Sequence, residues 1–264
     1  MNLEQTNGRL QHFYRQYVDE GSTEIPWSSF DGTQYDDEIM ERGRNAWLLR
    51  TMDEYRSMVG FSELTHIAAE MQAPIDVVAC GSRVIRDEVR HVELCTKMME
   101  RLGGLKGASP TPNFVRTNPN HHLNVRAMQL AIGSCCIGET ISVIMLAGVR
   151  DNATDPVAHG VLTQMLRDES FHSRFGWLWL EKMNLEGRDH RWLNTYVPKV
   201  FAHIEPAVGQ TDGDSPSADH PFGAMDNRER RTRFYSAMDE IVEAFEERGL
   251  PGRKWWAQRI EFQH

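Results

Sequence analysis

Two short motifs of the same form stand 81 residues apart in this chain. One reads Asp87-Glu88-Val89-Arg90-His91 and the other reads Asp168-Glu169-Ser170-Phe171-His172, so each contains Glu-x-x-His. Residues three apart project from one face of an α-helix, so the carboxylate and the imidazole of each copy point the same way. Carboxylates and neutral imidazoles are ligands for iron, manganese and zinc. One Glu-x-x-His arises by chance in many solvated helices, whereas a repeat within two mostly apolar helices predicts a metal site.

The helix expected over 121–150 offers one further ligand. Glu139 is the only charged residue between Arg126 and Arg150. A buried carboxylate without a partner loses several kcal/mol of hydration or takes up a proton, and a metal ion removes that penalty. Glu139 is therefore predicted to be a metal ligand, with a neutral, hydrogen-bonded core glutamate as the alternative.

The helix expected over 36–71 offers Glu54, Glu63 and Glu70. Facing residues of a helical hairpin lie about equally far from its turn, which is expected at 72–73. Glu88 lies roughly 15 residues after that turn, Glu54 about 18 before it and Glu63 about 9 before it. At about 1.5 Å per residue the mismatch is about 4 Å for Glu54 and about 9 Å for Glu63. Glu54 is the predicted ligand. Glu63 is expected to be solvated or to contact a ligand without contacting the metal.

Four carboxylates and two imidazoles suit two divalent ions that share bridging carboxylates. Such a set leaves positions for O2 or a substrate. Zinc sites in proteins have fewer ligands, so this oxygen-rich set favours two iron ions, with Mn/Fe or Mn as alternatives. The predicted ligands, which are also the predicted catalytic residues, are Glu54, Glu88, His91, Glu139, Glu169 and His172.

Other residues lie close to these ligands along the helices. Asp87 and Asp168 precede the motif glutamates, and each is expected to accept a hydrogen bond from the ligand histidine of the facing motif, which would fix its tautomer. The alternative is that they are polar residues on a helix flank. Four residues one turn from a ligand are candidates for the lining of a substrate pocket, with plain packing as the alternative for the two cysteines: Cys95, Cys135, Val143 and Met165.

The elements that must position these residues are helices, because no segment shows sustained two-residue alternation. We expect an all-α fold in which two antiparallel hairpins, joined by a long crossover, form a four-helix bundle. A C-terminal helical appendage completes it. The expected helices span 36–71, 74–102, 121–150 and 156–184, with the crossover at 103–120.

The remaining segments are expected to surround this bundle. Residues 1–35 are interpreted as an N-terminal arm with a short helix over 3–19, 36–184 as the bundle, and 185–264 as a C-terminal helical extension packed on it. Within the extension, helices are expected over 189–207 and 227–249, separated by a polar loop at 209–219.

Composition limits the partners. The net charge of −9 argues against nucleic acid and against an anionic membrane surface. The apolar stretch 127–149 is interrupted by several polar residues, so it is interpreted as a buried core helix. The four cysteines show no C-x-x-C spacing and the amino terminus has no apolar signal region, which predicts reduced thiols in a cytoplasmic protein.

The order of a lone Glu, Asp-Glu-x-x-His, a second lone Glu and Asp-Glu-x-x-His resembles the ferritin-like di-iron carboxylate superfamily. The amino-acid sequence around Glu54-Tyr55-Arg56-Ser57 and Ile137-Gly138-Glu139-Thr140 is similar to the sequences of a group of bacterial ferritin-like domain proteins. The resemblance covers about 45–185 and implies a four-helix bundle with a dinuclear site, usually of iron.

Three positions depart from better-known branches of that superfamily. Val143 stands where bacterial multicomponent monooxygenases place a Thr. Cys95 stands where the radical-generating subunit of ribonucleotide reductase has a Tyr, and Met165 where the arylamine N-oxygenases have an additional His. A close likeness to any of these three branches is therefore not expected.

Two classes of function follow from a dinuclear iron site. The first is an oxidoreductase that activates O2 to hydroxylate, desaturate or cleave a small organic substrate. It would take electrons from an external donor, and a homodimer is compatible with it. The second is iron handling, meaning ferroxidase, storage or peroxide scavenging. A structural bundle that keeps these residues without metal is disfavoured, because clustered buried carboxylates would destabilise its core.

Overall fold

The computed structural model describes residues 15, 17–105, 114, 116–183, 185–209 and 220–263. Within these residues the regular structure is helical and no strand occurs, as the all-α prediction requires. Most of the predicted helix at 3–19, half of the crossover and nearly all of the polar loop at 209–219 lie outside the described residues.

Contacts divide the chain into two compact units. The first comprises Met1–Arg116, Asn152–Asp168 and His220–Gly223, and the second comprises Thr117–Asp151, Glu169–Asp219 and Ala224–His264. Helix α6 (Pro156–Lys182) is continuous and contributes its first half to one unit and its second half to the other. The predicted division at 35/36 and 184/185 stays a prediction.

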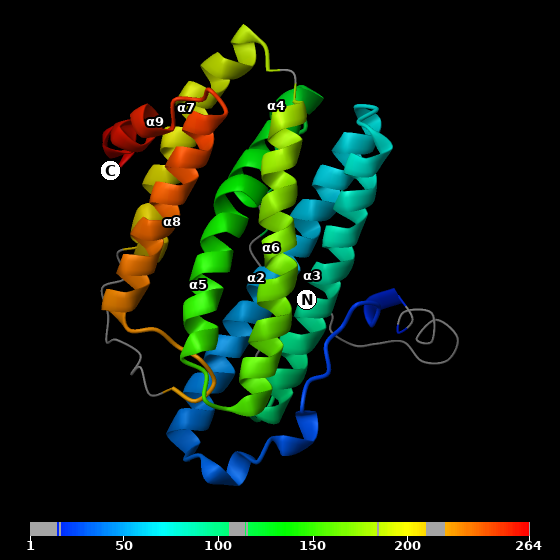
Figure 1. The fold of residues 1–264 in the computed structure, drawn as a ribbon, viewed down its shortest axis with the longest axis vertical. Helices are drawn as coiled ribbons and strands as arrows, with labels where there is room; N and C mark the ends of the chain where they lie inside the picture. Colours follow the sequence, from blue (N-terminus) through cyan, green and yellow to red (C-terminus); the bar gives the residue numbers. More distant parts are fainter. Residues whose placement is uncertain are drawn as a thin grey trace. The chain divides into compact units, whose positions relative to one another are not determined.

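The first unit is built on the hairpin of α2 (Asp37–Glu70) and α3 (Ile75–Arg101), which run side by side (Figure 1). Asp36 caps α2 by accepting a hydrogen bond from the Ile39 amide at 2.7 Å. Pro74 is the N-cap residue of α3, so this helix begins at Ile75, one residue later than the predicted start at 74. After α3, Gly103 has a φ of 106°, a left-handed conformation that glycine adopts without strain. These local signals explain why both helix boundaries fall within a few residues of the predicted ones.

Segments distant in sequence complete the first unit. Asp155 caps α6 through the amides of Val157 (3.0 Å) and Ala158 (2.8 Å), and it accepts a hydrogen bond from the Tyr35 hydroxyl at 3.1 Å. The N-terminal arm also carries two short 3-10 helices, η1 (Trp27–Ser29) and η2 (Gly32–Gln34).

The segment His220–Gly223 packs against α2 in this unit. Phe222 approaches Gly43 so closely that a Cβ there would lie 2.4 Å from its ring. His220 is 6% exposed, and burial together with the charge of Arg42 lowers its pKa. The imidazole is therefore favoured in its neutral form in the folded protein.

The second unit departs from the prediction of one regular helix over 121–150. The chain forms α4 (Leu123–Leu130), then a nine-residue π-helix, η3 (Ala131–Glu139), then α5 (Thr140–Asp151). The wider π-turns shift the register of the residues that follow them relative to a regular α-helix. The Tyr196 hydroxyl donates to the Gln129 carbonyl at 3.0 Å just before this segment, and a Cβ on Gly133 would lie 2.5 Å from that hydroxyl oxygen.

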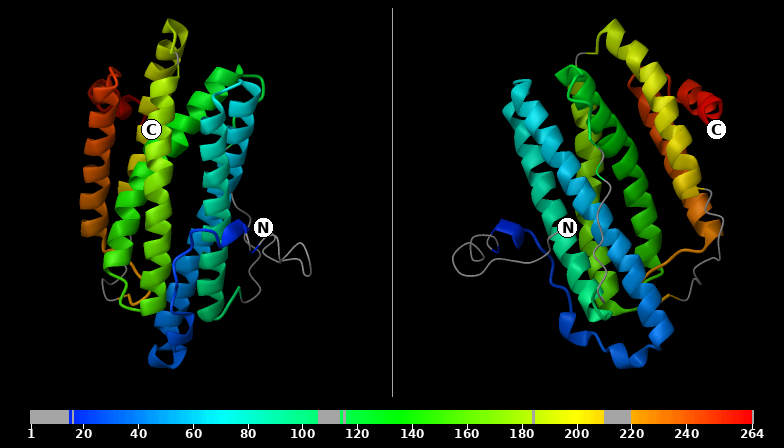
Figure 2. Two further views of the ribbon diagram at one scale, coloured as in Figure 1. Left: turned by 45° about the vertical axis from the view of Figure 1, so that its right-hand side comes forward. Right: turned by 180° about the vertical axis from the view of Figure 1, so that it is seen from behind.

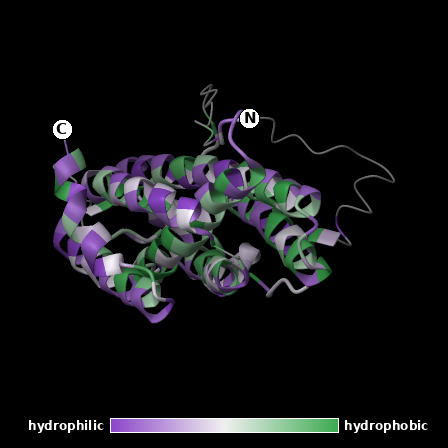
Figure 3. Cartoon of the chain, turned by 90° about the horizontal axis from the view of Figure 1, so that it is seen from above, coloured by the Kyte–Doolittle hydropathy of each residue, from purple (hydrophilic) through white to green (hydrophobic). Residues whose placement is uncertain are grey.

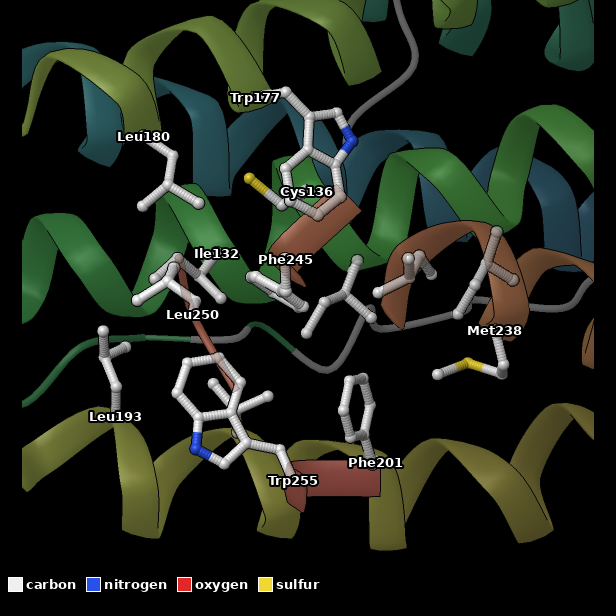
Figure 4. Close-up of a cluster of buried hydrophobic side chains, with 14 of the residues drawn as sticks. Ile132, Cys136, Trp177, Leu180, Leu193, Phe201, Met238, Phe245, Leu250 and Trp255 are labelled. Atoms are coloured by element: carbon white, nitrogen blue, oxygen red, sulfur yellow. The ribbon is translucent and has the colours of Figure 1, made fainter. Parts of the chain in front are cut away.

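The rest of the second unit is α7 (Gly187–Ile204), the π-helix η4 (Glu205–Gly209), α8 (Asn227–Glu247), α9 (Gly252–Gln258) and the 3-10 helix η5 (Arg259–Phe262). Helix α8 packs on α5, and α9 contacts α7 and α8 (Figure 2). Trp255 and Phe245 lie in one core with Cys136 and Trp177 (Figure 4). The predicted extension thus shares a hydrophobic core with η3 and the second half of α6.

Hydrophobic and hydrophilic residues alternate along the helices (Figure 3), which is typical of helices that bury one side. Among the described residues, Leu123–Asp151 is the one helix long and apolar enough to cross a membrane, and 56% of its apolar window is buried within the protein. Core helices pass the same test. The four cysteines, all among the described residues, form no disulfide.

Candidate metal centre

Glu54, Glu88 and His91 form a cluster inside the first unit, here named ligand group 1. One ligand atom from each lies within 4.8 Å of those of the other two. The His91 Nδ1 atom is 3.3 Å from Glu54 Oε2 and 3.8 Å from Glu88 Oε2. Glu54 is 8% exposed, and Glu88 and His91 are 0% exposed. The hairpin of α2 and α3 therefore places two carboxylates and one imidazole around a common point.

The other nitrogen of His91 faces away from these carboxylates. Its Nε2 atom lies 3.4 Å from Asp168 Oδ2, at the end of the first half of α6. A ligand histidine is commonly oriented in this way by a carboxylate on its second nitrogen. In this arrangement Nδ1 of His91 faces the two carboxylates of ligand group 1 and Nε2 faces Asp168.

Arg90 links the two motif aspartates within the first unit. Its Nη1 atom donates to Asp87 Oδ1 at 3.2 Å and to Asp168 Oδ2 at 3.0 Å. Burial raises the pKa of Asp168, but hydrogen bonds from His91 and Gln164 outweigh it, and the pKa is lowered. Asp168 is thus held as a carboxylate, the form that accepts from an imidazole N–H.

Glu139, Glu169 and His172 form a second cluster inside the second unit, here named ligand group 2. One ligand atom from each again lies within 4.8 Å of those of the other two. The His172 Nδ1 atom is 2.9 Å from Glu169 Oε2. Their exposed fractions are 6%, 2% and 0%. Each unit therefore contains a cluster of two carboxylates and one imidazole.

A close approach of η3 to α6 builds ligand group 2. A Cβ on Gly176 would lie 2.4 Å from the Cβ of Cys135, so the two helices meet without a side chain between them. Gly176 is one turn after His172, and Cys135 is one turn before Glu139. The same contact that requires glycine therefore sets the separation of the ligands on the two helices.

Thr140 fixes the end of the π-helix beside these ligands. Its Oγ1 atom donates to the Cys136 carbonyl at 2.7 Å, lies 2.8 Å from Ser173 Oγ and accepts from Trp177 Nε1 at 3.1 Å. Ser173 and Trp177 belong to α6, so these hydrogen bonds tie the residue after Glu139 to the helix that carries Glu169 and His172. π-Segments within α-helices are frequently found at functional sites.

The other candidates occupy varied positions. Glu63 is half-buried and lies outside both ligand groups. Cys95 and Met165 are fully buried, and their sulfur atoms are 3.7 Å apart. Cys135 is fully buried against Gly176, and Val143 is half-buried. Cys95 and Met165 therefore contact each other through their sulfur atoms, and Cys135 packs on backbone.

Sequence reasoning missed the hydrogen bonds that Arg90 and Gln164 donate to Asp168. For Gln164 a sequence signal was present. Gln164 stands four residues before Asp168 and donates to it at 2.7 Å, just as Arg83 stands four residues before Asp87 and donates to it at 3.3 Å. On a helix this spacing brings donor and acceptor together. A donor one turn before each motif aspartate could have been read from the sequence.

The donor chemistry fits a divalent metal in each ligand group. Two carboxylates compensate the charge of one M²⁺ ion, and an imidazole nitrogen adds a ligand suited to iron, manganese or zinc. Clustered carboxylates buried to this degree are disfavoured unless a cation or protons compensate them. Each group could therefore hold a metal ion.

Comparisons of the chain with protein-family models, with curated proteins and with solved structures found no match.

Proposed function

We propose that ligand groups 1 and 2 together form a dinuclear iron centre within a ferritin-like four-helix bundle. The bundle would consist of the α2–α3 hairpin and of the hairpin made by α4–η3–α5 with α6. Helix α6 supports this proposal because it is continuous at the boundary between the units. Asp168 contacts His91 of group 1, and the next residue, Glu169, belongs to group 2, with its Cα atom about 3.8 Å further along the chain.

The observation that carries the proposal is that the two groups have the same composition but come from different pairs of helices. Group 1 comes from α2 and α3, and group 2 comes from η3 and α6. A chance cluster of buried acids would not be expected to recur with the same two Glu and one His. Under the proposal, Glu54, Glu88 and His91 together with Glu139, Glu169 and His172 would hold the two ions. Four carboxylates would then balance two divalent ions.

We propose further that the protein activates O2 to oxidise a small organic substrate by hydroxylation, desaturation or cleavage. A di-iron centre, when bound, would pass electrons from an external donor to O2. The chain's residues hold the ions, fix the protonated nitrogen of His91 and exclude bulk water through burial. The proposal includes an external electron donor and a cytoplasmic location.

The test is reconstitution with Fe(II) without oxygen, followed by exposure to O2 while the optical spectrum is recorded. We expect about two irons per chain and an absorption band that is lost in Glu139→Ala and Glu54→Ala. Glu63→Ala is the matched control, because Glu63 is on the same helix as Glu54 but outside both ligand groups. The control should keep both irons.

The result also separates the two classes of function. Substrate screening is justified if iron uptake stops at about two per chain. Continued O2 consumption with iron accumulating beyond that ratio would assign a ferroxidase instead. Failure to bind stoichiometric iron, manganese or cobalt would refute the metal centre, and the six residues would then be a buried polar network.

A further inference from the structure

The N-terminal arm is hydrogen-bonded to a buried amide behind the metal-ligand candidates. The Thr23 amide and its hydroxyl both donate to Gln164 Oε1, at 2.6 and 2.7 Å. A backbone N–H can only donate, so Oε1 must be the acceptor and Nε2 must face the other way. There it donates to Asp168 Oδ2 at 2.7 Å. The arm thus determines which end of the Gln164 amide meets the carboxylate.

A second connection leads from the arm to the same oxygen. Arg90 donates from Nε to the Val18 carbonyl at 2.8 Å and from Nη2 to the Glu20 carbonyl. Its Nη1 atom donates to Asp168 Oδ2 at 3.0 Å. Two carbonyls of the arm therefore hold the guanidinium in the position from which it reaches Asp168.

Both connections end on the atom that faces His91. Asp168 Oδ2 accepts from Gln164 and Arg90 and lies 3.4 Å from His91 Nε2. Gln164 is 1% exposed, and Asp168 and Arg90 are each 3% exposed. Inside the protein these hydrogen bonds are stronger than in water, and a donor or acceptor left without its partner is strongly penalised. The carboxylate is consequently fixed in the rotamer that presents Oδ2 to the imidazole.

We propose that Thr23 and Gln164 are positioning residues for the ligand His91, acting through Asp168. We name the chain Thr23–Gln164–Asp168–His91 the arm relay. In the neutral imidazole the relay favours a proton on Nε2 of His91, against Glu54 Oε2, which lies 3.3 Å from Nδ1, and so leaves Nδ1 available to a metal ion. The part of this proposal that concerns metal affinity rests on the proposed function, whereas the tautomer is a property of the metal-free protein.

A small pocket beside the relay sets the expected order of effects. Its volume is about 130 Å³, and Thr23, Trp27, Arg90, Lys97 and Gln164 are among its lining residues. Water in this pocket can replace the hydroxyl of Thr23 as a donor to Gln164. Loss of that hydroxyl should therefore have a smaller effect than loss of the Gln164 amide, which faces buried Asp168.

The chain offers a matched control for the hydroxyl. The Thr33 amide and hydroxyl both donate to Asp31 Oδ1, at 3.0 and 2.6 Å, in the same pattern as Thr23 and Gln164. Thr33 is also in the arm but outside the relay. The variants are therefore Gln164→Leu, Thr23→Val, Thr23→Ser and the control Thr33→Val.

The first measurement is the tautomer of neutral His91 in metal-free full-length protein, at a pH above the titration of its imidazolium form, by long-range ¹H–¹⁵N correlation NMR with assignment through His91→Gln. The wild type, Thr23→Ser and Thr33→Val should show the Nε2–H form. Gln164→Leu should show a mixture of both tautomers, and Thr23→Val a smaller change in the same direction. The second measurement is Co(II) affinity, expected to fall about tenfold in Gln164→Leu, by about two- to threefold in Thr23→Val, and not in Thr23→Ser.

An unchanged His91 tautomer in folded Gln164→Leu would overturn the arm relay, whatever the metal affinity. If Gln164→Leu does not fold, an equal tautomer in Thr23→Val and Thr33→Val overturns it. A tautomer that depends on Gln164 in a protein that binds no metal would support the relay while refuting the proposed function. Metal binding by the wild type with no change in either readout for the variants would refute the relay alone.

Discussion

Replacing Gly176 with alanine tests how ligand group 2 is assembled. The added Cβ would lie 2.4 Å from the Cβ of Cys135, 2.9 Å from its carbonyl carbon and 3.0 Å from the Cys136 nitrogen. Ordinary contacts of a Cβ atom begin at 3.4 Å, so α6 and η3 must separate by about 1 Å. Two of the three contacts are backbone atoms, which cannot rotate away.

Two opposing terms set the change in the free energy of unfolding. Alanine in a helix interior is favoured over glycine by about 1 kcal/mol. Overpacking a dense core destabilises by about 1–3 kcal/mol, and contact with backbone places this site in the upper half of that range. We therefore expect Gly176→Ala to lower the free energy of unfolding by about 1–2 kcal/mol.

The matched control is Gly60→Ala on α2. A Cβ at Gly60 meets nothing within 4 Å, so only the helix-propensity term acts and the variant should be more stable by about 1 kcal/mol. Urea unfolding of both variants isolates the packing term as a difference of about 2–3 kcal/mol.

Metal affinity supplies a second readout for the same variant. Ligand sets tolerate displacements of about 0.5 Å, and the expected separation is larger. Gly176→Ala should therefore weaken metal binding about tenfold or more, while Gly60→Ala should not. If the two variants are equally stable, the close approach of α6 and η3 is wrong. If stability falls but metal affinity does not, this contact does not set the ligand separation.

Three further predictions concern titratable groups outside the ligand groups. Burial lowers the pKa of His220 below 6.5. The stability that the neutral His220 side chain contributes is therefore present above about pH 6.5 and is lost as the pH falls. The variant His220→Leu should show a smaller drop in melting temperature between pH 7.5 and 5.5 than the wild type. Burial raises the pKa of Glu205, but hydrogen bonds from Arg259, Tyr235 and Gln263 and the charge of Arg259 together outweigh it, and the pKa lies below 4.5. Glu205→Gln should cost about 1–3 kcal/mol in urea unfolding at pH 7, and less as the pH falls below about 4.5. Burial and the charge of Asp155 raise the pKa of Tyr35 to about 12; Asp155→Asn should lower it while leaving it above 10, measured by ultraviolet titration of tyrosinate.

The sequence was sufficient for features that depend on neighbours a few residues away. Asp36 and Asp155 are readable as helix caps because the amides they bond lie two or three residues further on. Glu88 and His91, or Glu169 and His172, share a helix face because the α-helical repeat is 3.6 residues. The choice of Glu54 over Glu63 also required only the length of a hairpin.

The π-helix could not be read from the sequence in the same way. Residues 131–139 are as apolar as any buried α-helix, so their periodicity gives no warning. The wider turns accompany tertiary contacts: Tyr196 on the Gln129 carbonyl, and Gly176 against Cys135. The free energy of these contacts offsets the poorer hydrogen-bond geometry of a π-turn.

The surroundings of His91 were likewise decided by the tertiary structure. Thr23 and Gln164 are 141 residues apart, and Arg90 reaches Asp168 across 78 residues. Sequence identifies a donor or an acceptor, but it does not state which pair will be buried together and must satisfy one another. The sequence alone thus determined the types of the candidate ligands and the helix faces that carry them. The tertiary structure determined which side chains orient them, because burial makes those long-range hydrogen bonds obligatory.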